Sequence, residues 1–220
     1  LARDIIFARV IGAEALADVF FVAFKIPNFF RRLFAEGAFA QAFVPVLGEY
    51  REKGSQAALK ELTNRVFGTL GATLLLLTLV IVIASPLFAA LFAPKWYFND
   101  GFKFNATAEM LRITFPYLLF ISMTGVAGGI LNSYDRFAVP AFTPVLLNLS
   151  LIFAALIAAP WFDQPTYALA WGVFAAGAIQ FCFQLPFLAR LHMLPVPVVD
   201  WKHPGVRKIL GLMGPAIFGV

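Results

Sequence analysis

The chain has 220 residues, of which 61% are hydrophobic and 13% are charged, and its formal net charge is +5. A soluble domain carries roughly 25% charged and about 45–50% apolar residues, so this composition excludes a soluble domain and predicts an all-α, polytopic membrane protein. The basic residues cluster in short loops between apolar runs, which follows the positive-inside rule and argues against nucleic-acid binding. The single Cys182 excludes an internal disulfide framework and a cysteine-based zinc site.

The expected elements follow from the apolar runs, because a spanning helix needs about 20 mostly apolar residues. In chain order we expect the second half of a first helix (1–12), a charged apolar segment (15–50), a polar loop or surface helix (51–65), a span (66–93), a turn-rich loop (94–105), further spans (106–133, 140–160 and 166–189), a basic cytoplasmic loop (191–205) and the start of a seventh helix (206–220). Residues 1–190 would form one bundle of about six helices, the first one truncated. Both ends of the sequence interrupt apolar runs, so we expect a fragment of a longer protein.

Lys and Arg are distributed unevenly between alternate loops, and this asymmetry predicts the orientation of the chain in the membrane. One set of loops holds most of the basic residues: Arg51, Lys53, Lys60, Arg65, Arg136, Arg190, Lys202, Arg207 and Lys208. The other set holds only Lys95 and Lys103. We therefore expect the first set, and the missing amino end, on the cytoplasmic side.

The segment 18–50 is apolar and rich in Phe, yet charged side chains interrupt it. Charges inside a membrane segment are costly, so they usually face a water-filled cavity or pair with one another. Spacings of seven, three, four and four residues place one set of polar side chains along a single stripe of a helix: Asp18, Lys25, Asn28, Arg32 and Glu36. Arg31 lies three residues from Asn28, so it can flank the groove that this stripe would line. Pro27 favours a bend in the helix just before Arg31 and Arg32.

Two interpretations of this segment are open. In one, a helix over 15–30 ends with Arg31 and Arg32 at the cytoplasmic face, and an interfacial helix over 37–50 follows. In the other, one long bent helix lines a cavity, with Lys25 and Asn28 facing water. Because residues 37–47 are apolar but too short for a separate span, we favour the cavity narrowly.

Arg3 and Asp4 raise the same question in the first helix, where a cytoplasmic flank is the alternative to an intramembrane site. Arginine suits bidentate recognition of phosphate through its planar set of donors. Arginines that converge from the first two helices would form an anion site inside the membrane.

The remaining polar motifs indicate no catalytic, metal-binding or nucleotide-binding site. Glu109 and Arg112 form an i,i+3 pair that we interpret as interfacial anchoring. His192 and His203 have no third metal ligand nearby, so we expect no metal site. No catalytic Ser/His/Asp set, phosphate loop or nucleotide-binding glycine motif is present, so we expect neither an enzyme nor a cofactor.

The sequence resembles a known family at three stretches: ARDIIFAR (2–9), DVFFVAFKIPNFFRRLFAEGAFAQAFVPVLGEY (18–50) and LRITFPYLLFISMTGVAGGILNSYDRFAVPAFTPVLLNLS (111–150). These stretches are similar to the MurJ (MviN) family of lipid II flippases, within the multidrug/oligosaccharidyl-lipid/polysaccharide exporter superfamily. The resemblance implies a transporter of fourteen helices in two lobes around a cationic cavity. This chain would supply most of the first lobe and the start of helix seven.

The resemblance also implies a function, namely flipping of lipid II across the bacterial cytoplasmic (inner) membrane by alternating access, driven by an ion gradient or the membrane potential. By motif match, Arg3, Asp4 and Arg31 fall on positions linked to binding of the head group, whereas Asp18, Asn28 and Glu36 match positions of gating or structural importance. Lys25 and Arg32 complete the expected cavity lining. The alternatives are a flippase for another polyprenyl-diphosphate glycan, a drug exporter of the same superfamily, and a membrane enzyme acting on polyprenyl phosphates.

Overall fold

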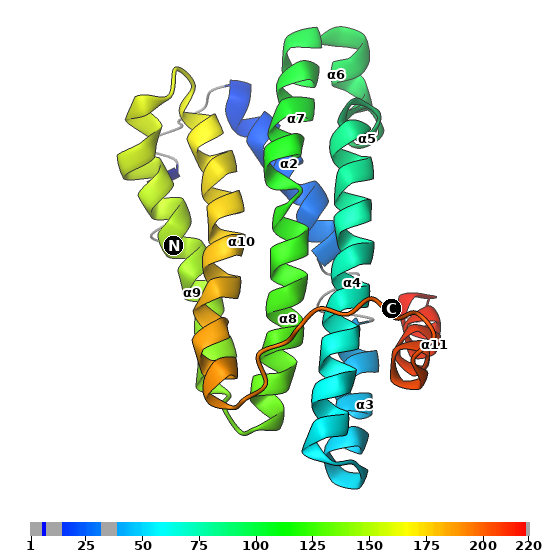
Figure 1. The fold of residues 1–220 in the computed structure, drawn as a ribbon. Coiled ribbons are helices and arrows are strands. Elements are labelled where there is room, and N and C mark those ends of the chain that lie inside the picture. The colour runs from blue at the N-terminus through cyan, green and yellow to red at the C-terminus, as the bar shows by residue number, and fades with distance from the viewer. Residues whose placement is uncertain (1–5, 8–14, 32–38, 219–220) are drawn as a thin grey trace. The chain divides into compact units, whose positions relative to one another are not determined.

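The computed structural model describes residues 6–7, 15–31 and 39–218 (Figure 1). These residues form helices and connecting turns, and no strand occurs among them. The helices are α2 (Ala15–Arg31), α3 (Phe39–Lys53), α4 (Gln56–Ile83), α5 (Ser85–Phe92), α6 (Pro94–Asn99), α7 (Gly101–Thr114), α8 (Tyr117–Ser133), α9 (Ala138–Phe153), the π-helix η2 (Ala154–Ala158), the 3-10 helix η3 (Ala159–Trp161), α10 (Pro165–Arg190) and α11 (Pro204–Phe218).

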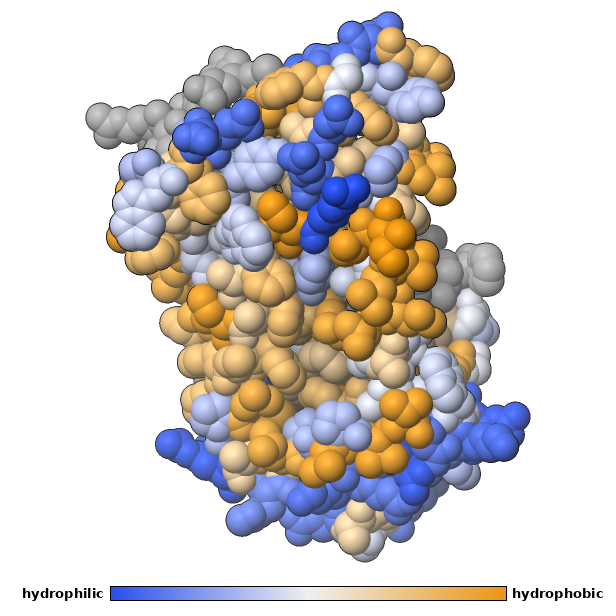
Figure 2. Space-filling view, turned by 45° about the horizontal axis from the view of Figure 1, so that its top comes forward, coloured by the Kyte–Doolittle hydropathy of each residue, from blue (hydrophilic) through white to orange (hydrophobic). Residues whose placement is uncertain are grey.

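Among the described residues, four helical stretches are long and apolar enough to cross a membrane. They are Gln56–Ile83, Gly101–Ser133, Ala138–Trp161 and Pro165–Arg190. On the face drawn in Figure 2, hydrophobic side chains cover wide areas, and hydrophilic side chains gather in separate patches. The all-α, polytopic membrane class predicted from composition is therefore confirmed.

The surface helix, which is one of the two alternatives for 51–65, is present, whereas the predicted start and end of the span 66–93 are wrong, and both errors come from residues that start helices. The polar stretch 51–65 is helical except at a short turn, because α3 continues to Lys53 and α4 already begins at Gln56, where the Ser55 hydroxyl accepts from the Ala58 N–H at 3.2 Å. The predicted span 66–93 is two helices, because α4 ends at Ile83 and α5 restarts with a proline in its first turn. Proline is suited to that position, where its missing N–H has no helical partner.

The predicted turn-rich loop 94–105 is also wrong, since it forms α6 and the start of α7. Pro94 occupies the first turn of α6, and the Asp100 carboxylate caps α7 by accepting from the Lys103 N–H at 3.1 Å. The residues that suggested turns therefore act as helix starters. Later boundaries lie closer to expectation, with α10 at Pro165–Arg190 and α11 beginning at Pro204.

The chain divides into two compact units. The first comprises Leu1–Phe29, Leu77–Leu118 and Pro144–Ile179. Within it α5, α6 and α7 pack together, and the buried face of α2 contributes Val19, Phe20 and Ala23 to its core. A Cβ on Gly172 of α10 would come within 2.6 Å of the Ala154 Cβ in η2, so only glycine permits this approach.

The second unit comprises Phe30–Leu76, Leu119–Thr143 and Gln180–Val220. Within it α11 packs against α3, and Lys208 of α11 forms an ion pair with Glu49 of α3. The segment 193–203, which we name the strap, has no helix and crosses α4 on its way to α11 (Figure 1).

Backbone hydrogen bonds hold the strap on α4. The Val196 N–H donates to the Asn64 side-chain oxygen at 2.8 Å, the Val198 N–H to the Asn64 carbonyl at 3.1 Å, and the Asp200 N–H to the Thr69 hydroxyl at 3.0 Å. Gly68 makes the approach possible, because a Cβ there would overlap the backbone atoms of Val198. The strap is thus a fixed part of the second unit and has defined hydrogen-bond partners.

Asp200 anchors the far end of the strap through its carboxylate. Its oxygens accept from the backbone N–H groups of Lys202 at 2.9 Å and His203 at 3.1 Å, and from the guanidinium of Arg65. The Lys202 N–H is the main cause that lowers the pKa of Asp200 below its usual range, and Arg65 adds to it. A carboxyl group with a lowered pKa stabilises the folded state above its unfolded pKa, and this contribution is lost as the pH falls through the folded pKa.

We expect Asp200→Asn to lower the thermal midpoint at pH 7, with a difference from wild type that narrows as the pH falls below about 4, near the ordinary pKa of a free aspartate. Scans of both proteins in detergent from pH 7 to pH 3 measure this difference. A constant gap over the whole range would contradict an anchoring role for the ionised carboxylate.

Candidate functional site

Three residues of the polar stripe predicted on α2 lie within the described residues: Asp18, Lys25 and Asn28. Asp18 and Lys25 lie two turns apart on the exposed face of α2, whereas Val19, Ala23 and Ile26 on the opposite face are fully buried. The exposed side of the helix therefore carries these two charges together with Phe21 and Phe29, which are 54% and 53% exposed, while its other side packs into the core.

Asp18 has a partner that its sequence neighbours do not supply. Its carboxylate lies 3.7 Å from the Lys103 ammonium of α7, which also lies 5.5 Å over the ring of Trp96. Asp18 is 71% exposed, so the pair contributes at most about 1 kcal/mol. The main effect of the pair is on the net charge of the stripe, because the Lys103 ammonium offsets the negative charge of Asp18. Lys25 has no ion-pair partner among the described residues.

The remaining predicted site residues are described only in part. Asn28 is half-buried on α2, and Arg31 is half-buried as its last residue. Arg3, Asp4, Arg32 and Glu36 lie outside the described residues. Since α2 ends at Arg31 and α3 begins at Phe39, with 32–38 also outside, the choice between one bent helix and two helices stays a prediction.

Pro27 explains an unusual contact beneath the stripe. Proline has no N–H, so the carbonyl of Ala23, four residues earlier, loses its helical donor. The buried hydroxyl of Thr114 on α7 donates to that carbonyl at 3.1 Å. A freed carbonyl in a membrane helix has to be satisfied by a neighbour, and Thr114 meets that need from 91 residues away.

We expect Thr114→Val to destabilise the protein by about 1–2 kcal/mol, because valine keeps the shape of threonine but leaves the Ala23 carbonyl without a donor. The cost should fall to a few tenths of a kcal/mol in a Pro27→Ala background, where residue 27 regains an N–H. Unfolding midpoints in a mixed detergent series measure all four proteins of this cycle. Equal costs in both backgrounds would show that Thr114 acts only through packing.

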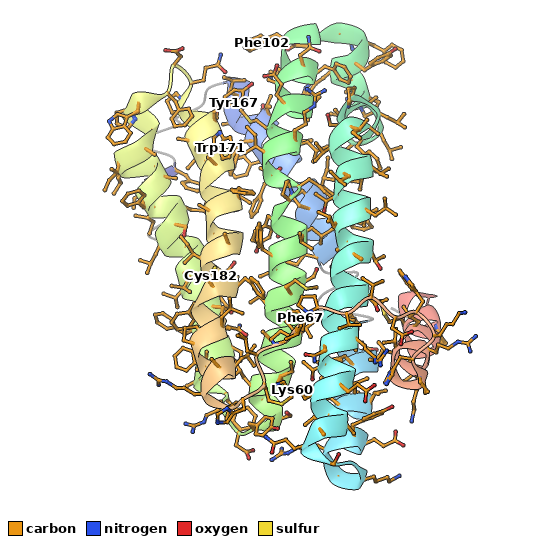
Figure 3. All side chains as sticks on the ribbon, in the orientation of Figure 1. Lys60, Phe67, Phe102, Tyr167, Trp171 and Cys182 are labelled. Atoms are coloured by element: carbon orange, nitrogen blue, oxygen red, sulfur yellow. The ribbon has the colours of Figure 1, made fainter. Side chains whose placement is uncertain are left out.

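The sequence pair Glu109 and Arg112 is not a pair in the structure. Glu109 accepts from the Tyr167 hydroxyl of α10 at 2.6 Å, and Tyr167 points from α10 toward α7 (Figure 3). Arg112 donates through Nε to the buried Ser85 hydroxyl of α5 at 2.8 Å. Both side chains therefore join α7 to other helices of the first unit, which helical spacing alone could not reveal.

The described residues include no group of three or more His, Cys, Asp or Glu side chains placed to hold a metal ion. His192 is exposed at the end of α10, and the His203 ring lies 6.4 Å from that of Tyr50. The described part of the candidate site offers charged and amide side chains, whose polar groups form hydrogen bonds and ion pairs.

Three comparisons bear on identity. A solved structure described as lipid II flippase MurJ in an inward closed conformation matches 99% of this chain with a TM-score of 0.72 and 24% sequence identity, which shows the fold. A probable lipid II flippase MurJ from Vibrio cholerae is 49% identical over all of this chain, and one from Haemophilus influenzae is 47% identical. A lipid II flippase MurJ from Burkholderia cenocepacia is 44% identical.

The chain spans less than half the length of these proteins: 44% of the Haemophilus influenzae relative, 43% of the Vibrio cholerae relative and 44% of the solved structure. This share agrees with the expectation of one lobe of a two-lobed transporter. The family model for lipid II flippase MurJ matches residues 7–220, nearly the whole sequence. The chain therefore belongs to the MurJ family of lipid II flippases.

Proposed function

We propose that the protein to which this chain contributes flips lipid II across the bacterial cytoplasmic membrane by alternating access. Membership of the family and the names of the curated relatives support the substrate. A flippase is a transporter and makes no covalent change to its cargo, so no catalytic residue is assigned.

The exposed charge on α2 is the observation that carries this proposal. Asp18 and Lys25 are exposed on a helix whose other face is buried and apolar, in a chain built for a membrane. In the proposal, this face lines a water-filled cavity that also includes Asn28, Arg32 and Glu36. Arg3, Asp4 and Arg31 bind the head group within it.

The sign of the charge favours an anionic cargo. Asp18 is offset by Lys103, which leaves Lys25 as the basic group of the described stripe, and Arg31 lies beside the stripe at the end of α2. A pyrophosphate offers acceptor oxygens that a guanidinium binds in a bidentate manner. A drug exporter for cations would instead need carboxylates without a basic partner on this face, whereas Asp18 is paired with Lys103.

We also propose an orientation of the chain in the membrane and an energy source for transport. The amino end lies in the cytoplasm, as the Lys and Arg distribution predicts. The family resemblance implies that an ion gradient or the membrane potential drives transport, and this sequence contains no nucleotide-binding motif. A charge that crosses the full membrane potential gains about 2.3 kcal/mol per 100 mV.

Complementation tests the substrate directly. We expect the full-length gene to restore growth of a bacterial strain depleted of its own lipid II flippase, because lipid II export is then the missing step. Membrane abundance of the introduced protein, measured by immunoblot, is the control. Failure at normal abundance would overturn the assignment and favour another polyprenyl-diphosphate glycan as cargo.

A further inference from the structure

A pocket of about 330 Å³ lies within the second unit, where α8 ends, α9 begins and α10 ends. Its lining combines two arginines with apolar side chains: Arg136, Phe137, Val139, Phe187, Arg190 and Leu191. The spans Ala138–Trp161 and Pro165–Arg190 respectively begin and end here, so the pocket lies at the boundary between apolar helix and polar turn. It shares no residue with the stripe on α2.

The two helices that end at this pocket are capped by their own backbone. Asp135 has a φ of 59°, and the Arg136 N–H donates to the Leu131 carbonyl at 2.9 Å. His192 has a φ of 56°, and the Met193 N–H donates to the Leu188 carbonyl at 3.0 Å. These are Schellman caps, which already satisfy carbonyls of the last turn. The two guanidinium groups are therefore not needed as helix caps.

Basic residues outnumber acidic ones in the lining of this pocket. The one acidic residue in its lining, Asp135, lies 3.9 Å from the guanidinium of Arg51, which in turn lies 5.3 Å over the Tyr134 ring. Arg136 and Arg190 form no ion pair with a carboxylate in the part of the chain that the structure describes. Two exposed guanidinium groups thus face one small volume, and the single carboxylate in its lining lies next to Arg51.

An aromatic track leads away from the arginines along the spanning helices. The Arg190 guanidinium lies 5.8 Å over the Phe187 ring, the Phe187 and Phe183 rings lie 5.5 Å apart, and the Phe183 and Phe142 rings 5.7 Å apart. Phe142 is 45% exposed and Phe137 beside the pocket is 58% exposed. A guanidinium stacked on a ring keeps its N–H edge available for an oxyanion.

We propose that this pocket binds an anionic phospholipid, with its phosphodiester between Arg136 and Arg190 and one acyl chain along Phe183 and Phe142. The arginines explain the selection of a negative head group, and basic pockets at the ends of membrane helices are suited to this task. The aromatic track favours a lipid over a free phosphate, because a soluble ion would leave the exposed rings without a partner. This inference does not depend on the cargo of the transporter.

Native mass spectrometry of the full-length protein tests the proposal, with phosphatidylglycerol and phosphatidylcholine as probes. We expect wild type to bind phosphatidylglycerol at least tenfold more tightly than phosphatidylcholine, and Arg136→Gln with Arg190→Gln to lose that preference. Lys60→Gln with Lys202→Gln is the matched control, since it removes two exposed positive charges of the same unit outside the pocket. It should bind phosphatidylglycerol as wild type does.

Two further measurements distinguish binding of the whole lipid from binding of its head group alone. Water-soluble glycerophosphoglycerol should bind at least tenfold more weakly than phosphatidylglycerol, and Phe142→Ser should weaken only the lipid. Circular dichroism confirms that each variant keeps its helix content, and Arg136→Lys with Arg190→Lys should retain part of the preference. Equal binding of both lipids by wild type, an unchanged preference in the double glutamine variant, or equal affinity for the soluble head group would each overturn the proposal.

Discussion

Replacing Arg31 by alanine is expected to lower lipid II translocation at least tenfold while the amount of membrane-inserted protein stays the same. Arg31 is half-buried at the end of α2, on the helix that exposes Lys25. In the proposed function its guanidinium binds the pyrophosphate. A hydrogen bond to a charged group contributes about 1.5–3 kcal/mol, and each 1.4 kcal/mol changes an equilibrium constant about tenfold.

A translocation assay in vesicles, with lipid II labelled in the head group, measures the effect. Arg31→Lys should recover only part of the rate, because an ammonium keeps the charge but loses the bidentate geometry. Lys60→Ala is the control for charge alone, since Lys60 is exposed on α4 (Figure 3). A wild-type rate in Arg31→Ala would remove Arg31 from the binding site and leave the family assignment intact.

Gly68→Ala is expected to release the strap from α4. The new Cβ would overlap the backbone of Val198, which cannot rotate away as a side chain could. The strap then loses three hydrogen bonds, from Val196, Val198 and Asp200, each contributing about 1 kcal/mol. A total of about 3 kcal/mol corresponds to amide exchange about a hundredfold faster over the strap.

Hydrogen exchange of strap peptides, followed by mass spectrometry, measures this loss of protection. Gly71→Ala is the matched control on the same helix, because its Cβ would meet only the Met123 sulfur at an ordinary 3.7 Å. It should leave protection unchanged and slightly favour α4 through the higher helix propensity of alanine. Unchanged protection in Gly68→Ala would mean that the strap is held by α11 rather than by α4.

Composition and apolar run length predict the membrane class and the approximate position of α10, because hydrocarbon thickness imposes a span of about 20 residues. Composition and run length do not predict where the helices are interrupted. Pro94 and Asp100 read as turn residues, yet each starts a helix, and only the packing of α5, α6 and α7 decides between these roles. Pro116 likewise marks the interruption between α7 and α8 without showing at which residue each helix ends.

Helical periodicity predicts that Asp18 and Lys25 share one face, and the structure agrees. It could not pair Asp18 with Lys103, or Glu109 with Tyr167, because these partners are brought together by tertiary packing rather than by spacing. The same holds for Thr114, whose role depends on a carbonyl that only Pro27 makes available. The family resemblance implies that Arg31 rather than Arg32 binds the head group, a distinction that helical spacing cannot make because Arg32 lies on the stripe and Arg31 lies beside it.

The hydrogen bond between Thr114 and Ala23 also has a consequence for biogenesis. The two residues are 91 positions apart, and chains are synthesised at about 5–20 residues per second, so α2 leaves the ribosome roughly 5–20 s before its donor. During that interval the Ala23 carbonyl depends on water or on the insertion machinery. The backbone hydrogen bonding of α2 is therefore completed only when α7 arrives, and a pause in translation between them would prolong the time for which the Ala23 carbonyl lacks its donor.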